Sequence, residues 1–212
     1  MCFSKEVSLL TCFIGIFFII LLVNYGNKKF ETENKIFGNF FFFVIFIQFM
    51  EFIFWIDLDN KLGLNKLMTI IGSIINMMQP VLLYLIKVIF IKPDIFSLKN
   101  NNLIVLIINV FYTIYISNRY SDFLKNGKII TKKGKHNHLD WDWKNYYNDK
   151  FYPILVIINS FWLADFYYSL FFVFILSILF FISFTYYHYN YGELWCFFSI
   201  SVPFFLYLYS FK

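Results

Sequence analysis

Long apolar runs separated by short polar segments dominate the chain. Crossing about 30 Å of hydrocarbon takes about 20 apolar residues in an α-helix. Seven runs are candidate membrane spans: Ser8–Tyr25, Gly38–Ile56, Leu67–Ile86, Leu103–Ser117, Tyr152–Leu163, Tyr167–Tyr187 and Leu194–Ser210. A single helix over residues 151–187 would be about 55 Å long, so we expect a break near Ala164 and Asp165. The pattern predicts an all-α bundle of seven transmembrane helices.

Residues 40–46 are apolar at every position, whereas a barrel strand alternates between lipid and lumen. Helices therefore fit this chain better than barrel strands. We treat residues 1–212 as one polytopic domain, with the loop 118–150 as an extramembrane insertion. Within this loop we predict a small β-hairpin that turns at Gly134. Its second arm, residues 136–143, alternates in polarity and ends in two indoles that could rest on the membrane interface. We expect His138, Trp141 and the rest of this arm to pack against the end of the bundle.

Composition strengthens the membrane interpretation. Hydrophobic residues make up 60% of the chain and charged residues 15%, whereas a soluble domain is nearer half apolar and a quarter charged. The net charge of +5 is spread over loops, without the basic stripe of a nucleic-acid-binding protein. We therefore expect membrane lipids as partners and no nucleic acid. Abundant Phe, Ile, Asn, Lys and Tyr beside a single arginine indicate an AT-rich genome, such as that of a parasite, an endosymbiont or a large DNA virus.

Seven spans place the two termini on opposite faces of the membrane. We call side A the face of the N-terminus, the loop near Asp57, the loop 118–150 and the turn near Tyr189; side B is the other face. Side A has more Lys and Arg when the long loop is counted, and side B has more when it is not. Because short loops usually decide orientation, we predict side B in the cytosol and the N-terminus outside. The membrane could be that of a host or a virion.

Glu51 is the most informative polar residue, because a carboxylate in lipid costs several kcal/mol and must face protein or water. Gln48, Glu51 and Trp55 share one helix face. The third span adds Asn76 and Gln79 beside Pro80, which frees a backbone carbonyl. This stripe is either a site for a proton, a cation or a headgroup, or a set of hydrogen bonds that packs helices. Asn109 and Asn159 have the same two interpretations, and packing is the simpler one.

The pocket would lie at the side-A end, where the first, second and seventh helices meet. We expect Glu51 within reach of Ser4, Trp195 or Gln79. Cys2 should approach Cys196, and the two could form a disulfide if side A is extracellular or lumenal; the alternative, which we favour, is that both only pack. Small residues at Ser4, Ser8, Thr11 and Gly15 would let the first helix approach its neighbour closely.

A metal site is a weaker interpretation. His136, His138 and His188 fall on side A, where imidazoles and carboxylates could bind zinc. Ordinary interfacial histidines are the simpler interpretation. The chain has no P-loop, no dinucleotide fingerprint and no zincin motif. We therefore predict no catalytic residue and no cofactor.

The two ends of the chain carry short motifs: Met1-Cys2-Phe3-Ser4 followed by Ser8, and Leu194-Trp195-Cys196-Phe197-Phe198-Ser199. With the stretches 51–55 and 138–141, they resemble an uncharacterised family of polytopic membrane proteins from bacteria and large DNA viruses. The resemblance implies that both ends belong to one architecture and that the first loop is cytosolic. In the first loop this chain has lysines, whereas the bacterial members have a run of arginines. No residue inherits a catalytic role.

Three functions follow from these observations. The first is a membrane protein that binds or passes a small ligand, an ion or a lipid headgroup through a polar pocket. The second is a membrane-embedded, metal-dependent lipid hydrolase that uses side-A histidines and acidic residues. The third is a structural or assembly protein of a viral or host membrane, in which the polar residues serve packing.

Overall fold

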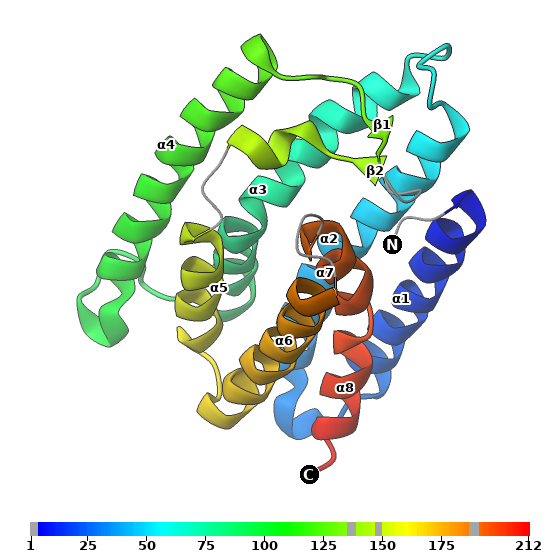
Figure 1. The fold of residues 1–212 in the computed structure, drawn as a ribbon. Helices are drawn as coiled ribbons and strands as arrows, with labels where there is room; N and C mark the ends of the chain where they lie inside the picture. Colours follow the sequence, from blue (N-terminus) through cyan, green and yellow to red (C-terminus); the bar gives the residue numbers. More distant parts are fainter. Residues whose placement is uncertain (1–3, 135–138, 147–149, 187–190) are drawn as a thin grey trace.

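The computed structural model describes residues 4–134, 139–146, 150–186 and 191–212, without the side chains of residues 191–194. These residues form a helical bundle with one small hairpin between α4 and α5 (Figure 1). The elements are α1 (Lys5–Tyr25), η1 (Lys28–Phe30), α2 (Glu31–Ile56), α3 (Leu64–Ile91), η2 (Lys99–Asn101), α4 (Asn102–Asn126), β1 (Lys132–Lys133), β2 (Leu139–Asp140), η4 (Asp142–Tyr146), α5 (Phe151–Phe161), α6 (Phe166–Tyr186), α7 (Tyr191–Ser199) and α8 (Val202–Tyr209). The predicted all-α bundle with a hairpin is confirmed.

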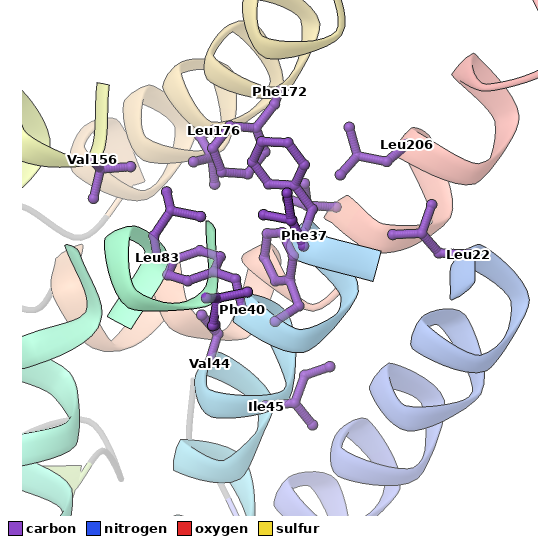
Figure 2. Packing of buried hydrophobic residues seen from close by; sticks show 14 of the residues in the cluster. Leu22, Phe37, Phe40, Val44, Ile45, Leu83, Val156, Phe172, Leu176 and Leu206 are labelled. Atoms are coloured by element: carbon purple, nitrogen blue, oxygen red, sulfur yellow. The ribbon is translucent and has the colours of Figure 1, made fainter. Parts of the chain in front are cut away.

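The central helix of the bundle is α2. It packs against α1, α3, α7 and α8. Figure 2 shows Phe37 and Phe40 among side chains from several other elements, and the Phe37 and Phe172 rings are 4.4 Å apart. Lipid is as apolar as these side chains, so close van der Waals packing and inter-helix hydrogen bonds hold such helices together in a membrane.

The helices α1 and α2 approach closely at Gly15. A Cβ atom placed on Gly15 would lie 2.6 Å from Cδ1 of Ile45 and 2.9 Å from Cγ2 of Ile200. Ser8 and Gly15 are both buried against the bundle. The small-residue stripe therefore lets α1 fit beside α2 and the last segment of the chain.

In the described part of the chain, five helices are long and apolar enough to cross a membrane: Lys5–Tyr25, Lys28–Ile56, Leu64–Ile91, Lys99–Asn126 and Phe166–Tyr186. The helix α5 has 11 residues, so it reaches only about 16 Å. The predicted reversal before α6 is present, and Leu163 has a positive φ of 54° there. Side A and side B correspond to the two ends of the bundle, with the start of α1 and the C-terminus at opposite ends (Figure 1).

The last predicted span consists of two helices, α7 and α8, which differs from the single helix that we expected. Pro203 lies in the first turn of α8. Its ring cannot donate a backbone hydrogen bond and clashes with the carbonyl four residues earlier, so the helix breaks before it. Membrane helices tolerate proline, so a proline within an apolar run did not indicate a break in the sequence pattern.

The hairpin pairs Lys132 with Asp140 and Lys133 with Leu139; residues 135–138 of its turn lie outside the described ranges. We expected the second arm to pack against the side-A end of the bundle, and its two indoles do so. Trp141 and Trp143 are 2% and 1% exposed and pack inside the bundle.

Two residues of α3 hold this loop in place. The Asn65 amide donates to the Thr131 carbonyl at 2.9 Å and accepts from the Thr131 backbone N–H at 2.9 Å. The hydroxyl oxygens of Thr69 and Thr131 are 2.9 Å apart and share a further hydrogen bond. All three side chains are buried. The loop is thus bound to the bundle by a specific polar contact as well as by its indoles.

Candidate functional site

The candidate site surrounds the side-A half of α2. Gln48 and Glu51 are both 0% exposed, and Trp55 is half-buried on the same face. The three- and four-residue spacing of a helix places them one above another. An ionisable side chain inside an apolar helix is stable only where it faces protein or water, and Glu51 faces protein. The expectation that Glu51 points into the bundle is met.

The helix α1 contributes the first wall of the site. Ile45 and Ile200 contact Gly15 at one level, and one turn nearer side A lie Thr11 on α1 and Gln48 on α2. The Thr11 hydroxyl donates to Oε1 of Gln48 at 3.1 Å. A polar contact therefore joins α1 and α2 directly beneath Glu51.

A second polar contact joins α3, α5 and α7. The Tyr152 hydroxyl donates to Oε1 of Gln79, and the Tyr152 ring lies edge-on to Trp195 at 5.7 Å. Gln79 is 1% exposed, and Asn76, one turn nearer side A, is 6% exposed. Gln79 lies 15 residues into α3 from side A, or about 22 Å, whereas Glu51 is about 8 Å from side A, so this contact is deeper in the bundle than Glu51.

The loop covers the site with aromatic rings. Trp141 and Trp143 stack at 4.9 Å with an interplanar angle of 17°, and Trp143 contacts Phe54 of α2 at 6.5 Å. Trp55 completes this group, with the Lys133 ammonium 5.9 Å from its ring centre. Four of the five tryptophans thus gather at side A, although two of them are inside the bundle and not at its surface.

The hydrogen-bonding capacity of these indoles is unused. Among the described residues, the buried Nε1–H groups of Trp55, Trp141, Trp143 and Trp195 have no acceptor. An indole nitrogen can only donate, and a buried one usually finds a partner. The fifth tryptophan, Trp162 near side B, does so: its Nε1–H donates to Oδ1 of Asn102 at 3.1 Å.

Several predicted site residues have other roles or lie outside the described ranges. Ser4 caps α1, where its Oγ accepts from the Val7 backbone N–H at 3.3 Å. Cys196 is buried beside the site, but Cys2 is outside the described residues, and with it the predicted disulfide. The three candidate metal ligands, His136, His138 and His188, lie outside as well. The described ranges themselves contain no cluster of three His, Cys, Asp or Glu side chains.

The structure adds one residue that the sequence pattern missed, Lys87. This lysine is 0% exposed, and its ammonium donates to the carbonyls of Ser160 at 2.7 Å and Trp162 at 2.6 Å. Its Nζ also lies 5.8 Å from the centre of the Phe37 ring. The predicted third span ended at Ile86, which left Lys87 in the loop; the signal available was a lysine directly after an uninterrupted apolar run.

A set of buried hydrogen bonds, which we call the polar seam, joins α3, α4 and α5. Its middle is the Asn109–Asn159 pair, in which each amide nitrogen donates to the other amide oxygen at 3.0 Å. Asn159 also donates to the Pro80 carbonyl at 2.8 Å. These bonds join α3, α4 and α5, which is the packing role that we considered simpler for both asparagines.

No protein-family model, curated protein or solved structure matches this chain. The resemblance carried by the terminal motifs therefore stays a hypothesis. Inference about function rests on the geometry of the site around Glu51.

Proposed function

We propose that this chain is a multi-pass membrane protein that binds a small polar ligand in the site around Glu51. The observation that carries the proposal is the complete burial of this carboxylate in the central helix, one turn from the hydrogen bond between Thr11 of α1 and Gln48 of α2. An amide would suffice to join two helices, as Gln48 and Gln79 do. A carboxylate at this depth costs several kcal/mol more, and such residues in membrane helices usually mark ligand, ion or proton sites.

The test compares the protein with its Glu51→Gln variant, which keeps the shape of the side chain and removes the charge. Each is purified in mild detergent, and native mass spectrometry measures small molecules that remain bound. We expect the wild type to retain an adduct that Glu51→Gln loses, with an unchanged unfolding temperature. Glu6→Gln, which alters an exposed carboxyl group on α1, is the matched control and should keep the adduct.

Two results would contradict the proposal. Equal adducts on wild type and Glu51→Gln would show that the carboxylate does not bind them. A change in unfolding temperature with no adduct on either protein would favour the structural or assembly role, in which Glu51 only packs helices.

We further propose that the N-terminus lies outside and the C-terminus in the cytosol. The support is the lysine-rich side-B segments, including Lys28 and Lys29, and an odd number of crossings when α5 and the α7–α8 pair are counted with the five long helices. Reporter fusions before Ser4 and after Lys212 should report opposite compartments. The same compartment for both fusions would exclude this topology.

A further inference from the structure

We propose a second binding site, at side B, for an uncharged membrane lipid whose headgroup carries hydroxyl groups, as monoacylglycerols and diacylglycerols do. The site is a cavity of about 540 Å³ between the start of α4 and the end of α5. Both of these helix ends lie at the same end of the bundle as the C-terminus (Figure 1). The proposal is independent of the site around Glu51, which lies close to side A.

The cavity is polar at its outer end and apolar further in. Asn100 and Asn101 of η2 line it with exposed amides, directly before α4. Val105 lies four residues beyond Asn101, or about 6 Å deeper along α4, and is buried. Ile158 lines the cavity from α5, about one turn before that helix ends. This order suits a lipid whose headgroup lies at the membrane surface and whose acyl chain extends inward.

The lining indicates a headgroup without charge. Among the residues that the structure describes, none that lines the cavity carries a charge. A charged group taken out of water needs an opposite charge or several hydrogen bonds, whereas hydroxyl groups need fewer partners. The side-chain amide of asparagine both donates and accepts hydrogen bonds, as a hydroxyl group does. The Asn101 side chain makes no capping bond to α4, so its amide is available to a ligand.

The wall of the cavity at Trp162 is held rigidly. The Trp162 Nε1–H donates to Oδ1 of Asn102 at 3.1 Å, and the Trp162 ring stacks on Tyr84 at 4.9 Å. The Trp162 carbonyl accepts from the buried Lys87 ammonium at 2.6 Å. Ligand sites are usually formed before the ligand binds, and a wall that is already ordered reduces the entropy lost on binding. A volume of about 540 Å³ is also typical of such sites.

The backbone around the cavity is unusual. In the described part of the chain, five residues other than glycine have a positive φ, and three of them line this cavity. Asn100 and Asn101 have φ angles of 53° and 59°, and Leu163, in the turn after α5, has 54°. Asparagine adopts this conformation readily, but a bulky leucine rarely does. Backbone strain of this kind is concentrated at binding sites, so its position supports a ligand here.

The test uses two lipids that both carry hydroxyl groups and differ in charge. The protein is reconstituted in nanodiscs of phosphatidylcholine that contain equal small amounts of dioleoylglycerol and phosphatidylglycerol, and native mass spectrometry measures the retained lipids. We expect enrichment of dioleoylglycerol over phosphatidylglycerol. Asn101→Gly tolerates the positive φ and removes the amide, so it should reduce the enrichment about two- to tenfold. Ala164→Trp places an indole in the cavity and should abolish the enrichment.

Each variant has a matched control. Asn60→Gly changes another asparagine with a positive φ, in the side-A loop between α2 and α3. Ser177→Trp adds an indole on the exposed face of α6. Both controls should keep the enrichment, and so should Glu51→Gln, because the cavity is at the other end of the bundle. Size-exclusion profiles and unfolding temperatures establish that each variant is folded.

A second measurement needs no variant. A diacylglycerol with a diazirine in one acyl chain is photoactivated in the same nanodiscs with the wild-type protein, and peptide mass spectrometry locates the label. We expect it in residues 100–108 and 158–164. A label spread over α1 and α6, enrichment of phosphatidylglycerol, or enrichment that persists in folded Ala164→Trp would each overturn the inference. None of these results affects the proposed function, which depends on Glu51.

Discussion

The ammonium group of Lys87, fully buried in α3, donates a 2.6 Å hydrogen bond to the carbonyl oxygen of Trp162. Trp162 is the residue that ends α5, and the second acceptor, the Ser160 carbonyl, belongs to the last turn of that helix. The last carbonyls of a helix lack partners within it and carry partial negative charge. Lys87 therefore caps α5 from a different helix and stabilises the reversal that leads into α6.

Lys87→Met should lower the free energy of unfolding by about 1–3 kcal/mol, because it removes the donor to the Trp162 carbonyl and leaves the Ser160 carbonyl only the Ser169 hydroxyl. Thermal unfolding in detergent, followed by size-exclusion chromatography, measures the change. Lys92→Met alters an exposed lysine just beyond the end of α3 and should have little effect. Equal stability of the two variants would mean that the cap contributes nothing.

The polar seam makes a second prediction. Asn109→Ala and Asn159→Ala should be coupled by about 0.6–1.7 kcal/mol in a double-mutant cycle, the range seen for side-chain hydrogen bonds in membrane bundles. Asn159→Ala should be the more destabilising single change, because it also removes the bond to Pro80. Asn39→Ala is the control, since the Asn39 amide bonds only within its own helix. Additive effects of the two variants would contradict a direct pair.

The contact between Asn65 and Thr131 makes a third prediction. Asn65→Ala removes two hydrogen bonds to the Thr131 backbone. Hydrogen exchange at residues 128–134 should become about 10–100-fold faster, and tryptophan fluorescence should shift to the red as Trp141 and Trp143 meet water. Asn118→Ala, at an exposed position of α4, serves as the control. Unchanged exchange in Asn65→Ala would show that the indoles alone hold the loop.

The loop between α2 and α3 gives a pH dependence. Burial raises the pKa of Asp57, but backbone N–H bonds from Leu62, Asn65 and Leu64 lower it more, so the net pKa lies below its usual value. A carboxyl whose pKa is lowered by folding stabilises the protein above its unfolded pKa of about 3.9 and loses this contribution as the pH falls through the lower folded pKa.

Asp57→Asn should therefore be less stable than wild type at pH 7, and the difference should shrink below about pH 4. Unfolding temperatures across that pH range test this. Asp59→Asn is the control, because the Asp59 side chain is 79% exposed. A difference that stays constant with pH would contradict a role for the Asp57 charge.

The sequence predicts the elements well and their contacts poorly. Helices follow from apolar runs, and the hairpin near Gly134 follows from alternating polarity, because both are local patterns. The pairing of Thr11 with Gln48, or of Tyr152 with Gln79, depends on which helices are neighbours, which hydropathy does not encode.

Two particular residues show where local reasoning fails. Lys87 ends an apolar run, and a lysine there reads as a headgroup contact; only the carbonyls of α5 make its burial favourable. Trp143 resembles an interfacial anchor in the sequence, yet it is buried against Trp141 and against Phe54 of α2. In both cases the partner that decides the burial belongs to another element. Ser160 follows Lys87 by 73 residues, and Phe54 of α2 is more than 60 residues from Trp143.

The position of Lys87 in the chain also affects how the protein is made. Its carbonyl acceptors are 73 and 75 residues later in the sequence. A ribosome that adds about 5–20 residues per second therefore needs roughly 4 to 15 s to produce them after Lys87. During that interval the Lys87 ammonium lacks both of these acceptors. The contact that joins α3 to the end of α5 can therefore form only after α5 has been synthesised.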